Sequence, residues 1–489
     1  MMGGLVCFLA NSAMLGMYRK AHRDFRYIRD VEKVQQEKLL GILARNAGTD
    51  FGRAHGFAKI RDMEGYRERV PLRDYGDFEP WLARIRAGEQ NVLTAEKVLL
   101  LEPTSGSTSG TKLIPYTQGL REEFQQGLKP WIYDLYTAPG LEGMRWGKSY
   151  WSVTPAATGR RRTQGGVPIG FEEDRAYFGR LEQWLLGLVL AAPGSLGREE
   201  DMDAFLGRTA RTLAGSGNLT FLSVWNPTYL ELLLDRVEAE GLGSPQTLWK
   251  RLAAVSCWAD AQAAGPARSL KERLPGVAFQ PKGLLATEGF VSFPVWGERG
   301  AALSVRSHFF EFELEDGSVL PAHRLERGCR GSVVLTTSGG LYRYRLKDEV
   351  EVTGFLGRIP LLRFLGRKGR VSDLFGEKLA EGFVGEVLGR LDLPQGLAFL
   401  APEGDRYVLY SGGSPDPEVL DMALRENFHY DYCRRLGQLK APAVYRLERD
   451  AAREYLEACV ARGQRLGDVK PPLLQLEGGW HKVLKGGFL

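Results

Sequence analysis

The chain has 489 residues, which is too long for one hydrophobic core, so the sequence predicts two or more domains. Its residues are 44% apolar, 26% charged and 10% aromatic, the composition of an ordinary globular protein. The 65 basic and 60 acidic residues give a formal net charge of +5, which is too balanced to indicate nucleic-acid binding.

The cysteines and histidines argue against two kinds of site. The five cysteines are odd in number, widely spaced and without a C-x-x-C motif, so we expect a reducing, cytoplasmic location with neither a disulfide framework nor a zinc site. None of the six histidines lies three or four residues from another, which argues against a histidine metal site.

The first 17 residues are almost uncharged and are followed by Arg19 and Lys20. A secretory signal would carry its positive charge before the apolar segment and small residues at a cleavage site after it. The segment is also short and broken by Gly and polar residues, which makes it marginal for a membrane span. We expect a helix packed on the domain, and a peripheral membrane contact through residues 1–17 is the alternative.

Helical periodicity predicts a helix from Asp30 to Asn46, and an apolar run predicts a buried strand at 98–101. Two helical segments follow, at 118–127 and 128–136. The stretch between the strand and these helices, Glu102 to Lys112, reads EPTSGSTSGTK.

This stretch has the composition of an anion-binding loop. Its glycines let backbone N–H groups turn toward an anion, its hydroxyls add donors, and Lys112 supplies counter-charge. It is not a Walker loop, because Gly106 and Gly110 are three residues apart and Thr111 precedes Lys112. The sequence therefore predicts a different phosphate loop, beside a helix N-terminus that adds donors. A flexible Ser/Gly surface loop is the alternative.

Between residues 150 and 300, apolar segments alternate with helical ones, which favours a largely parallel sheet. The expected strands are 150–153, 219–225 and 252–255, and the expected helices are 181–190, 201–213, 227–240 and 266–274.

The pattern changes after residue 303. Short strands with Asp-Gly and Gly-Gly turns up to residue 355 indicate an antiparallel, barrel-like region. A smaller unit follows from about Arg370 and ends in a Gly-rich tail of the kind that is usually frayed. Its expected strands are 397–400, 407–410 and 443–447, and its expected helices are 377–391, 418–428 and 451–462.

Three short stretches carry candidate chemistry. Glu288 lies in GLLATEG, and one carboxylate beside a polyphosphate is a natural Mg²⁺ ligand. Asp348 ends YRYRLKD, where alternation puts Arg343 and Arg345 on one strand face and a carboxylate at the turn can accept both ribose hydroxyls. Basic and Gly residues at 364–378 suggest a domain hinge. Taken singly, the first stretch also fits a plain strand end, and the second also fits an edge strand with solvated arginines.

In this order, the stretches resemble the adenylate-forming superfamily of acyl-CoA synthetases, peptide-synthetase adenylation domains and luciferases. The closer likeness is to the auxin-responsive acyl acid amido synthetases, plant enzymes that conjugate jasmonate, auxin or benzoates to amino acids, and to their bacterial relatives. The likeness includes TDFGRAHGF at 49–57, VPLRDY at 70–75 and FFEF at 309–312. Two positions depart from the plant pattern, with Leu284 in place of a Tyr and Lys347 in place of a Gly.

The resemblance implies an α/β fold with two domains. Residues 1–366 would form a large N-terminal domain with parallel α/β sheets and a distorted antiparallel β-barrel, which binds ATP and the acyl acid. Residues 367–489 would form a small, mobile α+β lid domain.

The resemblance also implies roles for individual residues. Thr287 would lie near the α-phosphate and Glu288 would bind Mg²⁺, while Lys378 and Lys482 would act from the lid. The triphosphate would be held by Ser105, Gly106, Ser107, Thr108, Ser109 and Lys112. The adenine would lie along Gly283, Leu284, Leu285 and Ala286, and the ribose would bind Asp348 and Arg367. The acyl pocket would include Val153, Thr154, Trp225 and Trp258.

The implied function is that of an ATP-dependent acyl acid amido synthetase. Such an enzyme adenylates a carboxylic acid with release of pyrophosphate, then transfers the acyl group to an amine or amino acid with release of AMP. An acyl-CoA ligase with the same first step, and a nucleotide-binding regulator without catalysis, are the alternatives. Trp151, Trp225 and Trp258 suggest an aromatic or long apolar acyl group, although they also fit a core.

Overall fold

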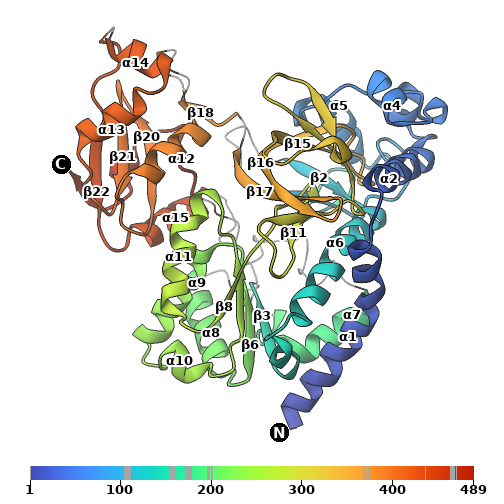
Figure 1. Cartoon of the computed structure of the whole chain (residues 1–489), viewed down its shortest axis with the longest axis horizontal. Helices are drawn as coiled ribbons and strands as arrows, with labels where there is room; N and C mark the ends of the chain where they lie inside the picture. The colour runs from blue at the N-terminus through green and yellow to red at the C-terminus, as the bar shows by residue number, and fades with distance from the viewer. Residues whose placement is uncertain are drawn as a thin grey trace.

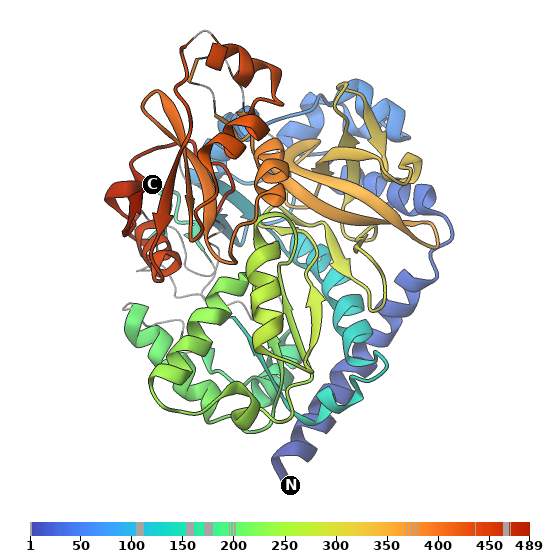
Figure 2. The same ribbon diagram turned by 60° about the vertical axis from the view of Figure 1, so that its left-hand side comes forward.

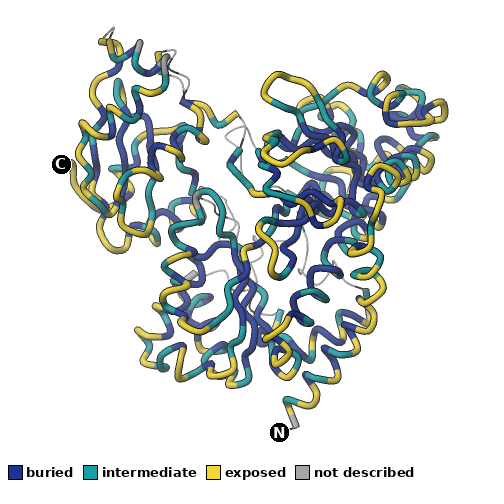
Figure 3. Tube along the Cα trace, in the orientation of Figure 1, coloured by how far each residue is buried: buried dark blue, intermediate teal, exposed yellow. Residues whose placement is uncertain are grey.

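The computed structural model describes residues 2–103, 112–152, 161–170, 179–194, 196, 199, 202–367, 369–372, 374–375, 377, 379–435, 437–462, 469 and 471–489. They form a parallel sheet, a seven-stranded antiparallel sheet and a smaller C-terminal sheet, with helices packed around them (Figure 1). Buried residues follow the sheets, whereas exposed residues mark the outer helices and loops (Figure 3). The expected combination of parallel α/β and antiparallel regions is confirmed.

The N-terminal segment forms one long helix, α1 (Met2–Arg26), which extends well past residue 17. It packs against α6 (Gln118–Tyr136) and α7 (Arg180–Val189), and its Cys7, Met14 and Tyr18 are buried there. The expected packed helix is therefore confirmed. Within the described part of the chain, no helix has both the length and the apolar character needed to cross a membrane.

The next helices cover the antiparallel sheet. The expected helix at 30–46 is α2 (Val31–Asn46), whose N-terminus is capped by the Asp30 side chain accepting from the backbone N–H of Lys33. Its residues Leu39, Ile42 and Leu43 are buried in the core of that sheet. The short helices that follow are α3 (Asp50–Ala54), α4 (Met63–Arg69) and α5 (Tyr75–Arg86).

The antiparallel region is a seven-stranded sheet with the order β11-β12-β17-β16-β15-β13-β14. The phenylalanines of β13, Phe309, Phe310 and Phe312, all lie in the core shared with α2. The strands are β11 (Ser292–Pro294), β12 (Ala301–Leu303), β13 (Phe309–Glu313), β14 (Val319–Pro321), β15 (Arg330–Thr336), β16 (Tyr344–Leu356) and β17 (Ile359–Arg367).

The expected order of strand, Ser/Gly loop and helix differs in one respect. The strand is β1 (Leu100–Pro103), but a second strand, β2 (Leu113–Tyr116), stands between the loop and α6. β2 pairs antiparallel with β1, because its short apolar run completes that edge of the sheet. β1 and β2 are therefore consecutive antiparallel strands, and α6 begins only after β2. The same sheet contains β5 (Pro168–Ile169) and β4 (Arg161–Arg162), in the order β2-β1-β5-β4.

The two helices expected at 118–127 and 128–136 are one helix, α6, with Pro130 inside it. Proline removes one backbone hydrogen bond of a helix. The buried side chains of Trp131, Ile132 and Leu135 continue the packed face beyond the proline, which keeps the helix continuous. Because α6 lies between the antiparallel and parallel sheets, its side chains contact both (Figure 1).

The parallel sheet has the order β3-β6-β7-β8, and every neighbouring pair is parallel. The strands are β3 (Lys148–Trp151), β6 (Leu219–Ser223), β7 (Ala254–Cys257) and β8 (Ala278–Pro281), of which β8 was not expected. Leu222 and Val255 face α8 (Met202–Ala214), α9 (Pro227–Ala239) and α11 (Ala264–Arg273). Phe221 and Ala254 face α1, α6 and α7. Short α10 (Pro245–Leu248) precedes β7.

After β17 the chain enters the C-terminal unit, whose sheet has the order β20-β21-β22-β23. The Gly-rich tail is not frayed as expected, because β23 pairs antiparallel with β22. The strands are β18 (Val371–Ser372), β19 (Leu379–Ala380), β20 (Ala398–Glu403), β21 (Arg406–Ser411), β22 (Ala443–Leu447) and β23 (Gly486–Phe488). The helices are α12 (Glu381–Arg390), α13 (Pro417–Leu424), α14 (Phe428–Arg435) and α15 (Ala451–Ala461).

This unit lies beside the helices of the parallel sheet, as both views show (Figures 1 and 2). One face of its sheet has its own core with α12 and α13. On the other side, Phe399 and Trp480 belong to the same buried cluster as Leu230 of α9. Asn226 Nδ2 also donates to the backbone oxygen of Val469, at 2.7 Å.

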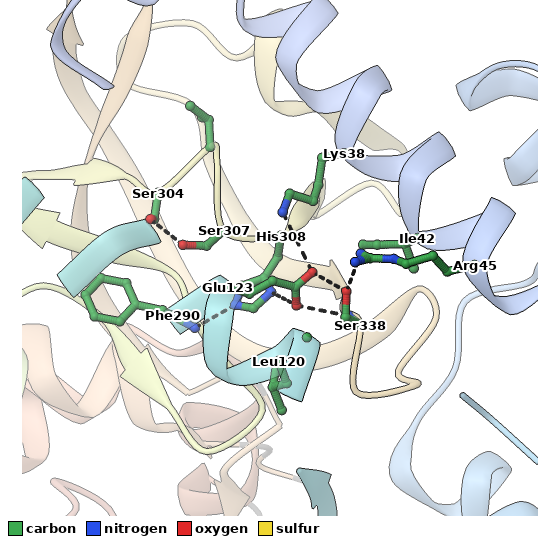
Figure 4. Close-up of polar contacts among 12 residues, drawn as sticks. Lys38, Ile42, Arg45, Leu120, Glu123, Phe290, Ser304, Ser307, His308 and Ser338 are labelled. Carbon is green, nitrogen blue, oxygen red and sulfur yellow. Dashed lines mark hydrogen bonds and ion pairs between the residues drawn. The ribbon is translucent and has the colours of Figure 1, made fainter. Parts of the chain in front are cut away.

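A buried carboxylate, Glu123 of α6, joins three other parts of the fold (Figure 4). Its oxygens accept hydrogen bonds from His308 Nδ1 (3.0 Å), from the Ser338 backbone (2.9 Å) and from Ser338 Oγ (2.7 Å). Lys38 Nζ of α2 lies 3.8 Å away. His308 Nε2 accepts from the backbone N–H of Phe290, at 2.9 Å, so Nδ1 is the nitrogen that carries the proton toward Glu123.

Burial alone raises the pKa of Glu123, but the His308 and Ser338 hydrogen bonds and the Lys38 charge hold that pKa below its usual range. A carboxyl group whose pKa is lower in the folded than in the unfolded chain stabilises the fold above its unfolded pKa. This stabilisation is lost as the pH falls through the lowered pKa.

We expect Glu123→Ala to lower the free energy of unfolding by about 3–5 kcal/mol, because it leaves several buried donors without their acceptor. Urea denaturation of the whole chain measures the change. Glu122→Ala, at an exposed position of the same helix, is the matched control and should cost less than about 0.5 kcal/mol. Equal losses in the two variants would contradict the role of Glu123.

Candidate active site

Glu288 lies in a tight hairpin rather than at a simple strand end. β9 (Leu285–Ala286) pairs antiparallel with β10 (Gly289–Phe290), and Thr287 and Glu288 form the turn. Gly289 is required there, since a Cβ on it would lie 2.9 Å from His308 Nε2. The Phe290 bond to His308 therefore connects this turn directly to the Glu123 network. Glu288 is only 5% exposed.

Glu288 belongs to a small polar group that we call the Lys112 group, formed by Lys112, Glu288 and Tyr344, with the Tyr344 hydroxyl between the other two side chains. Tyr344 Oη donates to Glu288 Oε1 at 3.1 Å, and Lys112 Nζ donates to Tyr344 Oη at 3.4 Å. Lys112 Nζ also lies 5.5 Å from the ring centroid of Tyr75. Burial lowers the pKa of Lys112, and the Glu288 charge partly opposes that shift. The chain thus places one ammonium and one carboxylate close together in a half-buried position.

Asp348 and Arg367 are also brought together. They are directly opposed in the β16–β17 pairing, where Arg367 is the last residue of β17. The Arg367 charge contributes to lowering the pKa of Lys112, so the guanidinium lies near that ammonium. Asp348 was expected at a turn, but it lies within β16. The structure therefore assembles Lys112, Glu288, Asp348 and Arg367 at one place.

The backbone before Asp348 keeps a left-handed conformation. Lys347 has φ of +67°, the conformation that a glycine at this position would favour. A side chain in this region costs about 1–2 kcal/mol, and the Lys347 ammonium lies 3.3 Å from Asp74. Lys347 therefore adopts a left-handed backbone conformation although it is not a glycine.

The arginines of YRYRLKD are engaged with protein carboxylates. Arg343, also left-handed at φ of +48°, is buried and donates to both oxygens of Glu311, at 2.9 and 3.1 Å. It also donates to the backbone oxygen of Val70, at 2.9 Å. Arg345 pairs with Glu313 at 2.9 Å. These contacts give both arginines a structural role, and the alternative of an edge strand with solvated arginines is wrong because β16 is a central strand.

Other predicted site residues lie elsewhere. Lys482, in the 3₁₀ turn Trp480–Lys482, is exposed on the C-terminal unit, and none of the described contacts joins it to the Lys112 group. Trp225 and Trp258 follow β6 and β7, with ring centroids 5.8 Å apart. The predicted residues Ser105, Gly106, Ser107, Thr108, Ser109, Val153, Thr154 and Lys378 lie outside the described residues.

Sequence reasoning missed Lys282. This lysine directly follows β8, is 7% exposed and lies against the aromatic rings of Trp131 and Trp225. No local signal marked it, because residues 279–285 read FQPKGLL, a mixed stretch in which a lysine is ordinarily exposed.

Two family models match the chain in order. They are the GH3 family N-terminal domain, over residues 23–193, and the GH3 family central domain, over residues 301–367. The probable indole-3-acetic acid-amido synthetase GH3.12 of Oryza sativa subsp. japonica is 23% identical over an alignment 578 residues long. The alignment covers 94% of this chain and 94% of that protein. The indole-3-acetic acid-amido synthetase GH3.17 of Arabidopsis thaliana is 23% identical over 573 residues, 93% of each chain.

Solved structures show the same fold. The GH3.15 acyl acid amido synthetase in complex with 2,4-DB has a TM-score of 0.79 at 18% identity, covering 96% of this chain and 94% of that chain. A 2-hydroxyisobutyryl-CoA ligase in the postadenylation state has a TM-score of 0.53 at 14% identity, covering 84% of this chain and 85% of that chain.

The two arginine pairs differ in burial, which gives a stability test. In the first pair, the side chain of Arg343 is 8% exposed and that of Glu311 is 1% exposed. In the second pair, the side chain of Arg345 is 31% exposed and that of Glu313 is 13% exposed. We expect Arg343→Met to lower the free energy of unfolding by about 3–5 kcal/mol, since Glu311 stays buried. Arg345→Met should cost about 1 kcal/mol or less. Urea denaturation compares them, and a reversed order would refute the structural role of Arg343.

Proposed function

The chain belongs to the GH3 family, and from this premise we propose that it is an ATP-dependent acyl acid amido synthetase. It would adenylate a carboxylic acid, release pyrophosphate, and transfer the acyl group to an amine or amino acid with release of AMP. The observation that carries the proposal is the Lys112 group beside Asp348 and Arg367, inside a fold shared over almost its whole length with an acyl acid amido synthetase.

The residues of this site fit a magnesium nucleotide. One carboxylate, Glu288, leaves most of a Mg²⁺ coordination sphere to phosphate oxygens and water, which is the arrangement this ion prefers. When bound, Mg²⁺ would neutralise phosphate charge and so favour attack on phosphorus. Tyr344 orients the Glu288 carboxylate by its hydrogen bond. Asp348 would accept the ribose hydroxyls, as its place opposite Arg367 allows.

The chemistry needs positioning and charge rather than a protein nucleophile. An oxygen of the acid forms a bond to the α-phosphorus of ATP, and pyrophosphate leaves. The barrier comes chiefly from charge repulsion and alignment, so a cation such as Lys112 and hydrogen-bond donors near Thr287 are the natural catalytic groups. The amine then attacks the acyl carbon, and AMP carries away the bonding electrons and the acid-derived oxygen.

We propose that residues 1–366 and 367–489 are two domains and that the second moves during the cycle. β17 ends at Arg367, beside the proposed boundary, and the C-terminal sheet has a core of its own. Lys378 and Lys482 would then be presented to the site in different half-reactions, because Lys482 has no described contact with the Lys112 group.

The test is carboxylate-dependent exchange of labelled pyrophosphate into ATP, followed by mass spectrometry of products with mixed amino acids. We expect exchange with at least one member of a broad acid panel and an amide product. Transfer to coenzyme A instead of an amine would identify an acyl-CoA ligase. ATP binding by calorimetry without exchange for any acid would indicate a regulator without catalysis and contradict the proposal.

We expect Glu288→Gln to reduce the exchange rate by about a hundredfold or more, because it removes the charge proposed to hold Mg²⁺. The variant should keep the thermal midpoint within a few degrees of the unmodified protein. Glu298→Gln, an exposed change ten residues further along the chain, is the control and should exchange normally. Normal exchange by Glu288→Gln would remove Glu288 from the metal site.

A further inference from the structure

Four side chains lie in register across the carboxyl ends of the parallel sheet. Trp151 pairs with Ser223, Ser223 with Ser256, and Ser256 with Gln280. Register-matched residues of neighbouring strands point to the same face of a sheet. This face is covered by α6, because Trp131 Nε1 donates to Gln280 Oε1 at 2.9 Å and its ring lies 5.6 Å from that of Trp151.

The Lys282 side chain lies over this row of four side chains. Its Nζ donates to Ser223 Oγ at 2.8 Å, and the ammonium lies 4.6 Å from the ring centroid of Trp131 and 4.8 Å from that of Trp225. Trp258 lies next to Trp225 at the end of the neighbouring strand. Aromatic faces attract a cation, but they replace only part of its lost hydration.

Lys282 has no counter-charge among the residues that the structure describes. Among the described residues, no carboxylate forms an ion pair with it, although it is 7% exposed. Burial lowers its pKa to about 7, and the neighbouring Cys257 acts in the opposite direction. An anion placed beside the ammonium would restore the charged form.

The neighbouring groups of the row provide hydrogen-bond donors. Within the described structure, Ser256 Oγ and Gln280 Nε2 are buried and have no hydrogen-bond partner. Gln280 Oε1 already accepts a hydrogen bond from Trp131, so the group of this amide that remains available is the Nε2 donor. Ser223 Oγ accepts from Lys282, which leaves its own hydrogen to donate elsewhere. A positive charge surrounded by unused donors is complementary to a carboxylate.

We propose that Lys282, with Ser223, Ser256 and Gln280, forms a subsite that binds a carboxylate of the acyl acid. The inference rests on the proposed function, since it takes the bound anion to be part of that substrate. Trp131, Trp151, Trp225 and Trp258 line the same subsite with aromatic surface. Lys282 is therefore a specificity-determining residue. The bound carboxylate is either the reacting group before adenylation or a second acidic group of the acid.

The test compares Lys282→Met with the unmodified protein in pyrophosphate exchange. Methionine keeps the apolar stem and removes the charge, and Lys271→Met, at an exposed position of α11, is the matched control. Ser256→Ala is a second variant that removes an unpaired hydroxyl and should leave folding intact. The acids are benzoate and hexanoate, with isophthalate and adipate as counterparts that carry a second carboxylate.

For Lys282→Met we expect at least a tenfold higher KM for the acid, with the KM for ATP within twofold of normal. Ser256→Ala should raise the acid KM about threefold or more, and Lys271→Met should change neither constant. A higher KM for all four acids would identify the reacting carboxylate as the group bound at Lys282. A higher KM for isophthalate and adipate alone would identify the bound group as a second acidic group. Unchanged acid KM values in an active Lys282→Met enzyme would overturn the proposal while leaving the proposed function intact.

A binding measurement makes the outcome independent of catalysis. Titration of tryptophan fluorescence with the same four acids, without ATP, should saturate in the unmodified protein, because Trp131 and Trp225 flank the subsite. Saturation should be lost in Lys282→Met and kept in Lys271→Met. If exchange is absent for every acid, the proposed function fails, and this titration alone decides the subsite. Equal titration curves for the unmodified protein and Lys282→Met, or no saturation by any acid, would overturn it.

Discussion

The buried carboxylate of Glu123 is the interaction on which the arrangement of the site depends. It binds His308, Ser338 and Lys38, which come from segments far apart in the sequence. His308 in turn holds the backbone of Phe290, two residues after Glu288. A charge buried this deeply is stable only while its partners remain in place, so the network permits little variation in the position of the Thr287-Glu288 turn.

The site combines two kinds of surface that meet near α6. On the antiparallel side, Lys112, Glu288, Asp348 and Arg367 supply charges of both signs for a magnesium nucleotide. On the parallel side, the strand ends supply tryptophans and the Lys282 ammonium. The segment from Lys282 to Glu288 passes from one surface to the other, which would place an acid and a nucleotide at its two ends.

Much of this arrangement follows from the sequence, because its signals are local. The helix at 30–46 has a strong apolar period and a capping Asp30, and strand 443–447 is bounded as expected. Glu288 and Asp348 stand in short motifs whose composition limits their roles. The resemblance added the order of those motifs, which none of them carries alone.

What the sequence could not reveal depends on contacts between distant residues. Glu123 and His308 are 185 positions apart, and no local pattern marks either as a partner of the other. The sequence alone gives no sign that Lys282 is buried. Its position over Ser223 depends on the register of three strands. The conformation of Lys347 was likewise hidden, because a lysine at positive φ contradicts local preference and is held by the sheet around it.

The central claim is that this site joins the oxygen of an acid to the α-phosphorus of ATP. The most direct measurement uses an acid labelled with oxygen-18 in its carboxylate, ATP and an amino acid, with mass spectrometry of AMP and pyrophosphate. The account predicts that each AMP formed carries one labelled oxygen and that pyrophosphate carries none. Unlabelled AMP, or label in pyrophosphate or phosphate, would contradict it.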